Sequence, residues 1–247
     1  MKNILYKIVN KIACILKPDA AVKNDIILIN DEYINWLSFA NAGMLQRGNL
    51  YCFDYAVKNI PSDNPILEIG AFCGLSTNII SYYKHMHKKN NKTYVIDKWI
   101  FEDNGSKEYI GFSEVKHADY KNFVKESFLR NVYFFSGNDL PVTFELFSDD
   151  FFSKWYDNNL TEDISGNKIQ PGGKFSFVFI DGNHSYDYAK RDFINADKFL
   201  DINGFILFDD SFDNSIFEVN RLTKEILLDK RYKLICKNPN YFFQKIE

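Results

Sequence analysis

Residues 65–77, Pro-Ile-Leu-Glu-Ile-Gly-Ala-Phe-Cys-Gly-Leu-Ser-Thr, combine a short apolar run with two glycines and the start of an apolar stripe. The run at 65–69 predicts a buried strand, and the stripe that continues through 75–86 has the spacing of a helix. Gly70 lets the chain turn sharply after the strand, and Gly74 lets the helix begin close to a ligand. A strand, a glycine turn and a helix in this order predict a cofactor-binding unit of an α/β domain.

The same alternation of apolar runs and helical patterns continues toward the C-terminus. Further strands are predicted at 94–97, 132–135, 175–181 and 205–208, and a terminal hairpin at 232–236 and 241–245. This alternation is typical of an α/β fold with a parallel sheet and helices on both faces. Asn203-Gly204 is predicted to end the helix that precedes the fifth strand, and Ser215 with Glu218 resembles a capping box that opens the next helix.

Two connections, 98–130 and 139–174, are longer than this fold requires. Long loops in compact domains are often functional. The aromatic-rich segments 101–128 and 144–155 are therefore candidates for a substrate lid or an oligomer contact.

The composition indicates one globular protein without a nucleic-acid partner. The chain has 247 residues, 46% of them hydrophobic, and its 30 Lys and Arg against 33 Asp and Glu give a net charge of -3. That balance provides no broad basic surface for phosphates. The four cysteines, Cys14, Cys52, Cys73 and Cys236, lack the spacing of a zinc or redox motif, so we expect reduced thiols and a cytoplasmic location.

Residues 1–17 contain four lysines and apolar residues at helical spacing. The lysines interrupt the apolar run well short of a membrane span, and no small-residue cleavage site follows. One interpretation is a helix that packs on the domain or on a second copy in a homo-oligomer. The other is a basic amphipathic helix that contacts the anionic inner face of the membrane peripherally.

The turn also favours one class of cofactor. Asp97 ends the second predicted strand, where its carboxylate can accept hydrogen bonds from both hydroxyls of a ribose. A pyrophosphate would need glycine where this chain has Phe72, and it would be repelled by Glu68. The cationic amine and sulfonium of S-adenosylmethionine suit an acid there. The sequence favours two other interpretations less: that the turn binds a dinucleotide, or that it is a tight turn without any ligand.

Acidic residues follow two neighbouring strands of the predicted sheet. Asp181 and His184 come after the fourth strand, and Asp209 and Asp210 end the fifth. Carboxyl ends of neighbouring parallel strands face one crevice, so these carboxylates repel each other unless a cation or hydrogen-bond donors compensate. Their oxygen atoms suit Mg²⁺ or Ca²⁺. As structural alternatives, Asp181 or His184 caps the following helix and the Asp209-Asp210 pair forms a turn.

Residues 68–76, Glu-Ile-Gly-Ala-Phe-Cys-Gly-Leu-Ser, resemble motif I of class I S-adenosylmethionine-dependent methyltransferases. They are most similar to the catechol O-methyltransferase branch and to macrocin-type sugar O-methyltransferases. The resemblance implies a Rossmann-like, seven-stranded, mostly parallel sheet of order 3-2-1-4-5-7-6, with an antiparallel last strand and helices on both faces. Residues 40–43, Ala-Asn-Ala-Gly, with Gly48, resemble a segment that catechol-type enzymes place over the methionine end of the cofactor.

The resemblance also implies roles for individual residues. The cofactor would be bound by Glu68, Gly70, Ala71, Phe72, Gly74, Ser76, Asp97, Asp139 as an adenine contact, and Asp181. Magnesium would be bound by Asp181, Asp209 and Asp210. His184 lies where catechol-type enzymes have their general base, three residues after Asp181, whereas sugar enzymes use an acid at the position of Asn183. His184 and Asp181 are thus the expected catalytic residues.

We therefore expect an α/β methyltransferase that moves the methyl group of S-adenosylmethionine to a hydroxyl of a sugar or another small molecule, with Mg²⁺ as an implied second cofactor. Residues 1–60 would form an N-terminal helical extension that packs on or caps the core, and 61–247 the methyltransferase domain. A neutral histidine, with an ordinary pKa of about 6.5, can accept the hydroxyl proton. A metal-independent N-methyltransferase, a non-catalytic cofactor-binding module and a dinucleotide oxidoreductase are the alternatives.

Overall fold

A computed structural model describes residues 26–100 and 108–247 of the chain. The amphipathic segment at 1–17, with its predicted membrane or partner contact, lies outside these residues, as does Cys14. The helices are α2 (Glu32–Ala40), α3 (Asn49–Asn59), α4 (Leu75–Met86), α5 (His117–Phe135), α6 (Ser148–Tyr156), α7 (Tyr186–Phe199) and α8 (Val219–Ile226). The strands are β1 (Ile66–Ile69), β2 (Thr93–Ile96), β3 (Val142–Phe144), β4 (Thr161–Glu162), β5 (Lys168–Ile169), β6 (Phe175–Ile180), β7 (Leu200–Phe208), β8 (Tyr232–Lys237) and β9 (Tyr241–Lys245).

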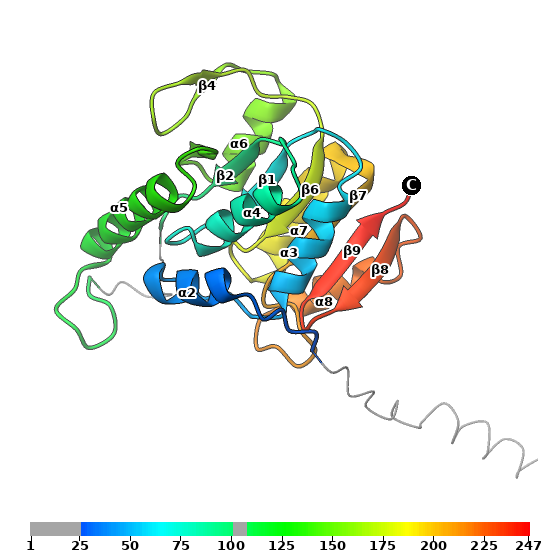
Figure 1. Cartoon of the computed structure of the whole chain (residues 1–247), viewed down its shortest axis with the longest axis horizontal. Coiled ribbons are helices and arrows are strands. Elements are labelled where there is room, and N and C mark those ends of the chain that lie inside the picture. The colour runs from blue at the N-terminus through cyan, green and yellow to red at the C-terminus, as the bar shows by residue number, and fades with distance from the viewer. Residues whose placement is uncertain (1–25, 101–107) are drawn as a thin grey trace, which may run out of the picture.

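Seven of these strands form one sheet in the order β3-β2-β1-β6-β7-β9-β8 (Figure 1). The first five are parallel to one another, and β9 runs antiparallel to both of its neighbours. The short strands β4 and β5 pair with each other outside this sheet. Numbered within the large sheet alone, the order is 3-2-1-4-5-7-6, so the predicted topology and its antiparallel last strand are confirmed.

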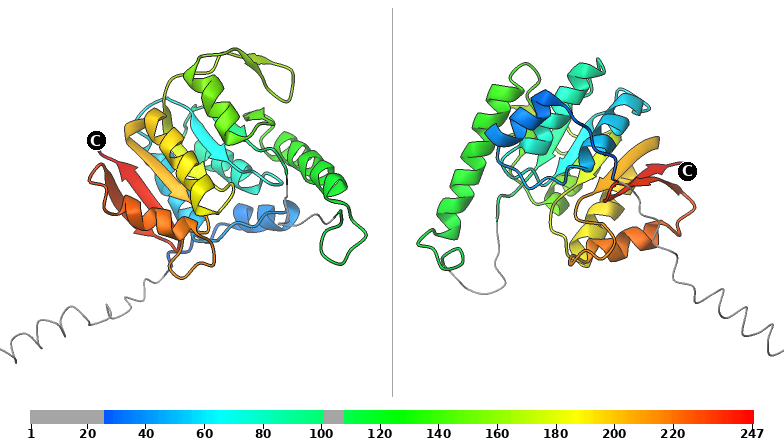
Figure 2. Two further views of the ribbon diagram at one scale, coloured as in Figure 1. Left: turned by 180° about the vertical axis from the view of Figure 1, so that it is seen from behind. Right: turned by 60° about the horizontal axis from the view of Figure 1, so that its bottom comes forward.

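Helices cover both faces of the sheet, as the two views of Figure 2 show. The helices α6, α7 and α8 pack on one face, and α2, α3 and α4 pack on the other. The central strands β1 and β6 are buried along their whole length. Burial on both faces explains why their sequences are continuous apolar runs rather than alternating ones.

The strand predicted at 132–135 is wrong, because these residues form the last turn of α5. Val124, Phe128 and Val132 are spaced by four residues and are the buried residues of that helix. A period near 3.6 is the helical period, and it outweighs the short apolar run at the end of the helix. The third strand of the sheet is β3, and much of the connection at 98–130 belongs to α5.

Other local predictions also need correction. The fifth strand begins at Leu200 rather than at 205, and Asn203, with a φ of 65°, lies inside it at an irregularity instead of ending a helix. The capping box is not formed, since α8 begins at Val219 without a side-chain cap, while Ser215 Oγ accepts the N–H of Phe217.

Most aromatic residues of 144–155 belong to the core and not to a lid, although Phe147 is 48% exposed. Phe144, Phe151 and Trp155 are at most 1% exposed and pack in the core between α6 and the sheet. The terminal hairpin is confirmed as β8 and β9.

The described residues before β1 pack closely on the rest of the chain. Helix α3 contributes Phe53 and Val57 to the same apolar cluster as β6 and β7. A Cβ atom on Gly48 would lie 1.8 Å from the backbone oxygen of Asn238, so this position needs glycine. The division at residue 60 stays a prediction. None of the helices within 26–100 and 108–247 has the length and apolar character needed to cross a bilayer.

Candidate functional site

The turn between β1 and α4 lies directly against the end of β6. Gly70 has a φ of 85°, and a Cβ atom there would lie 2.0 Å from the backbone oxygen of Asp181. The N–H of Asp181 in turn donates to the carbonyl of Ile69. Because the two backbones touch, the predicted cofactor turn and the predicted catalytic strand end are held at a fixed separation.

Asp97 braces this turn from the end of β2. Its Oδ2 atom accepts the backbone N–H of Ala71 at 2.8 Å and of Phe72 at 3.0 Å, and its Oδ1 accepts the N–H of Trp99 at 2.6 Å. Phe72 has a φ of 48°, a left-handed conformation that is costly outside glycine. Burial raises the pKa of Asp97, and the three N–H donors oppose that rise.

Trp99 completes the wall beside Asp97. Its side chain is fully buried, donates from Nε1 to the carbonyl of Phe72 at 3.0 Å, and packs on the ring of Phe128. A Cβ atom on Gly74 would lie 3.1 Å from that Phe128 ring, so α5 covers the outer side of the turn. Sequence reasoning missed Trp99, although it follows the strand-ending Asp97 by two residues.

Glu68 and Ser76 face each other in the interior rather than the crevice. The carboxyl group of Glu68 is fully buried and accepts hydrogen bonds from Ser76 Oγ and, at 2.6 Å, from Thr77 Oγ1. Burial raises the pKa of Glu68 to about 7. The hydrogen bonds from the two hydroxyl groups act in the opposite direction and lower this pKa. Glu68 thus connects β1 to the first turn of α4, and its predicted contact with the cofactor stays a prediction.

The segment 40–43 lies on the start of α4, and its predicted position over the methionine end of the cofactor stays a prediction. Asn41 is fully buried, donates to the carbonyl of Cys73 at 3.0 Å, and accepts from Asn78 at 2.7 Å. A Cβ atom on Gly43 would lie 2.5 Å from the side chain of Leu75. The segment therefore contacts the glycine turn, and Asn131 of α5 donates to the same carbonyl of Cys73.

Asp139 does not join the other predicted site residues. It follows α5 and accepts from Lys84 Nζ at 2.6 Å, and the same Nζ donates to Thr93. Thr93 begins β2, whereas Asp97 follows its end, so Asp139 lies at the opposite edge of the sheet. The expected adenine contact is corrected accordingly, because it depended on the wrong third strand.

Asp181, Asp209 and Asp210 meet at the ends of β6 and β7, as predicted. Asp209 is 2% exposed, and its Oδ1 atom accepts from Asn49 at 2.5 Å and from Asn240 at 2.6 Å. Asp181 and Asp209 are close enough for their carboxyl groups to influence each other electrostatically. Burial and the neighbouring Asp209 raise the pKa of Asp181, and burial raises that of Asp209 to about 6.

His184 lies between two of these carboxylates. Its Nε2 atom is 3.6 Å from Asp210 Oδ2 and 3.8 Å from Asp181 Oδ1, beyond hydrogen-bond length but close enough for electrostatic stabilisation of an imidazolium. Burial lowers the pKa of His184, and Asp210 opposes this shift. Gln46 Nε2 donates to the other oxygen of Asp210 at 3.2 Å.

The residues do not fit the implied magnesium site. Within the described parts of the chain, no group of three or more His, Cys, Asp or Glu side chains converges as metal ligands would. Two amide groups donate to Oδ1 of Asp209 and a third donates to Asp210, so protein donors compensate part of the negative charge of these carboxylates. Asn49 is the first residue of α3, and Asn240 directly precedes β9. No local motif marks them, and sequence reasoning missed both.

An open hollow of about 380 Å³ adjoins His184. It is lined by Asn183, His184, Ser185, Ile216, Phe217 and Glu218. The rings of His184 and Phe217 are 4.9 Å apart, and Ile216 is 90% exposed. The hollow therefore offers an apolar wall beside a candidate base.

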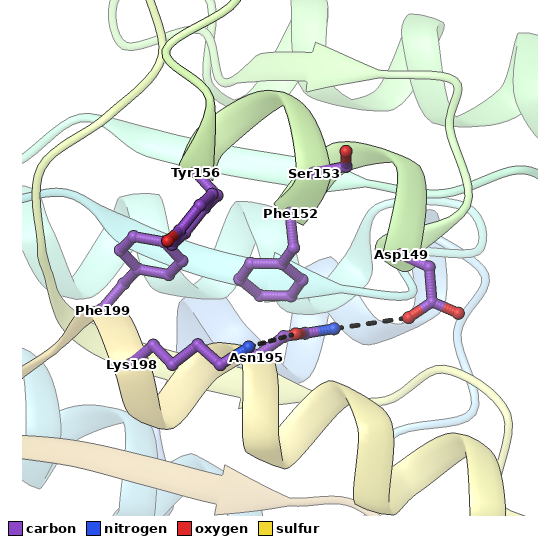
Figure 3. A pocket seen from close by; sticks show the side chains of 7 residues that line it. All are labelled: Asp149, Phe152, Ser153, Tyr156, Asn195, Lys198 and Phe199. Atoms are coloured by element: carbon purple, nitrogen blue, oxygen red, sulfur yellow. Dashed lines mark hydrogen bonds between the residues drawn. The ribbon is translucent and has the colours of Figure 1, made fainter.

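A second hollow, of about 260 Å³, lies between α6 and α7 (Figure 3). Asn195 accepts from Lys198 at 3.4 Å and donates to Asp149 at 3.3 Å across it. Its lining includes none of the residues at the strand ends, so we do not assign it to the same site.

A family model described as a methyltransferase domain matches residues 67–211. The matched range covers more than half of the chain and includes Asp97, His184 and all three strand-end carboxylates. No curated protein sequence matches the chain.

Solved structures of the same fold include several methyltransferases. An O-methyltransferase from Bacillus cereus, in complex with S-adenosylhomocysteine, is 16% identical with a TM-score of 0.53 over 90% of this chain and 94% of that one. The O-methyltransferase TomG from Streptomyces achromogenes, in complex with S-adenosylmethionine, is 13% identical with a TM-score of 0.55 over 90% and 93%. The TDP-rhamnose 3'-O-methyltransferase CalS11 is 13% identical with a TM-score of 0.52 over 88% and 97%. At these identities the likeness shows the fold.

Proposed function

The chain belongs to the methyltransferase domain family and is an S-adenosylmethionine-dependent methyltransferase, and we propose that its acceptor is a hydroxyl group of a small molecule. The observation that carries this proposal is the position of His184, between Asp181 and Asp210 and beside an open hollow. A hydroxyl acceptor must lose its proton during transfer, and a base at this point supplies that need. Neighbouring O-methyltransferases of the same fold support the proposal.

The cofactor would bind at the turn between β1 and α4. Asp97 would accept the ribose hydroxyls while it keeps the turn in shape through Ala71 and Phe72. Gly70 and Gly74 let the turn take its left-handed conformation while it packs against the backbone of Asp181 and the ring of Phe128. When bound, the cofactor supplies a methyl group that its sulfonium already activates.

His184 would accept the hydroxyl proton at Nε2. Its lowered pKa keeps the imidazole neutral, and therefore basic, at neutral pH. Asp210 stabilises the imidazolium that forms, and Gln46 fixes Asp210 from its other oxygen. The fixed contact between Gly70 and Asp181 aligns acceptor and methyl donor, and such alignment lowers the barrier of a bimolecular transfer.

The proposed reaction does not depend on Mg²⁺. The amide donors on Asp209 speak against the magnesium assistance that the resemblance implied. We therefore expect transfer to persist in a chelator. A loss that added Mg²⁺ restores would contradict this part of the proposal.

The test is transfer of label from methyl-labelled S-adenosylmethionine to a small-molecule extract, followed by identification of the labelled group. We expect a methyl ether, and His184→Ala should reduce its formation by roughly 10²-fold or more. His85→Ala, at an exposed position near the end of α4, is the matched control. A labelled amine, formed equally by His184→Ala, would favour N-methylation instead.

A further inference from the structure

The hollow beside His184 is acidic as well as apolar. Of its six lining residues, Glu218 is the one with a formal charge at neutral pH, and Lys and Arg are absent among them. Glu218 accepts the backbone N–H of Tyr186 at 3.1 Å, which fixes its carboxylate at the rim.

Further carboxylates lie beside His184. The side chains of Asp181 and Asp210 are 25% and 23% exposed, and they lie 3.8 Å and 3.6 Å from His184 Nε2. Two cations on the flanking helices are already paired with a carboxylate. Lys190 on α7 and Arg221 on α8 both contact Glu225, at 3.2 Å and 3.8 Å.

A negatively charged acceptor in this hollow would therefore meet the carboxylate of Glu218, and no Lys or Arg is among the described residues that line it. Phosphate groups are recognised in proteins by Arg, Lys or backbone N–H clusters, and like charges brought together disfavour binding. The apolar side chains of Ile216 and Phe217 instead offer a surface to an uncharged ring.

We propose that the methyl acceptor is a neutral or cationic hydroxyl compound with an apolar face, and that phosphorylated or otherwise anionic acceptors are excluded. This inference rests on the proposed function and narrows its substrate class. The accepted class includes free or glycosidically bound sugars, amino sugars and phenols. The excluded class includes nucleotide-activated sugars and thioesters of phosphorylated carriers.

The experiment separates labelled products by charge. The protein is incubated with methyl-labelled S-adenosylmethionine and a small-molecule extract, and the products are passed over an anion exchanger at pH 8. We expect at least nine-tenths of the new label to be unretained. Label that is retained, and released by phosphatase treatment, would overturn the inference while leaving the methyltransferase activity intact. Absence of transfer to any fraction would contradict the proposed function and this inference with it.

A charge-reversal variant tests the residue that carries the argument. Glu218→Lys should raise the ratio of anionic to unretained product at least fivefold, since it replaces the rim carboxylate with a phosphate-binding cation. Glu162→Lys, at an exposed position on β4, makes the same charge change away from the hollow and should leave the ratio unchanged. An unchanged ratio in Glu218→Lys, with S-adenosylhomocysteine binding intact, would contradict the role of Glu218.

Discussion

Gly70 shows how a single residue links the two halves of the site. Its φ of 85° is unfavourable for any residue with a Cβ atom, and the space that such an atom would fill is occupied by the backbone of Asp181. The sequence predicts the need for a positive φ, because a glycine after an apolar strand indicates a sharp turn. It does not predict the close contact with the backbone of Asp181, because that residue is more than a hundred positions away and local patterns contain no information on such a contact.

Gly173 provides a matched comparison for Gly70. It has a φ of 88°, but a Cβ atom there would meet nothing within 4 Å. Gly173→Ala should therefore cost only the left-handed strain, about 1–2 kcal/mol of unfolding free energy. Gly70→Ala should cost several kcal/mol more, measured by urea denaturation of both variants. Equal losses would show that the contact with Asp181 is not tight.

Glu68 should make stability depend on pH. Its pKa is about 7 in the folded protein and 4.5 for an ordinary glutamate. Between these values the unfolded chain has lost the proton that the folded chain keeps. The stabilisation that Glu68 contributes to the folded protein is therefore progressively lost as pH rises from about 4.5 to about 7.

Glu68→Gln removes this dependence, since glutamine does not titrate. Relative to the wild type, the variant should gain about 3 kcal/mol of unfolding free energy between pH 4.5 and pH 8, at about 1.4 kcal/mol per pKa unit. Urea denaturation at the two pH values measures the gain, with Glu126→Gln on the exposed side of α5 as the control. A constant difference between variant and wild type would mean that Glu68 is ionised throughout.

At the scale of elements, the sequence predicts best where one pattern dominates. The strands β1, β2 and β6, the helix α4 and the terminal hairpin lie within a residue or two of their predicted positions. The prediction failed at α5, which is buried on only one side. The helix ends in Val-Tyr-Phe-Phe, and this apolar run, taken by itself, resembles a strand. The error then displaced Asp139 from its expected role.

Helix α5 makes a direct prediction about two of its phenylalanines. Phe128 is fully buried against Trp99, whereas Phe134 is 75% exposed. Phe128→Ala should cost about 3–5 kcal/mol of unfolding free energy, the range for a buried phenylalanine. Phe134→Ala should change it by less than about 0.5 kcal/mol. Were 132–135 a buried strand, the second variant would be strongly destabilising as well.

At the scale of the whole molecule, the sheet order could be predicted and the assembled site only in part. Motif I and the strand ends located Asp97, Asp181, His184 and the Asp209-Asp210 pair, because parallel strands deliver such residues to one edge. The donors that engage Asp209 and Asp210 come from the N-terminal segment and the last hairpin. Contacts between such distant parts of the chain arise only in the folded molecule. Without them, the carboxylates alone suggested a metal.

The central claim is that the turn between β1 and α4, braced by Asp97, binds the adenosyl cofactor. Its most direct test is calorimetric titration of the protein with S-adenosylhomocysteine. We predict one binding site per chain, an affinity reduced at least tenfold by Asp97→Asn, and no loss in Asp139→Asn at the other edge of the sheet. A folded protein that binds a nicotinamide dinucleotide instead, or that loses affinity equally in both variants, would contradict the account.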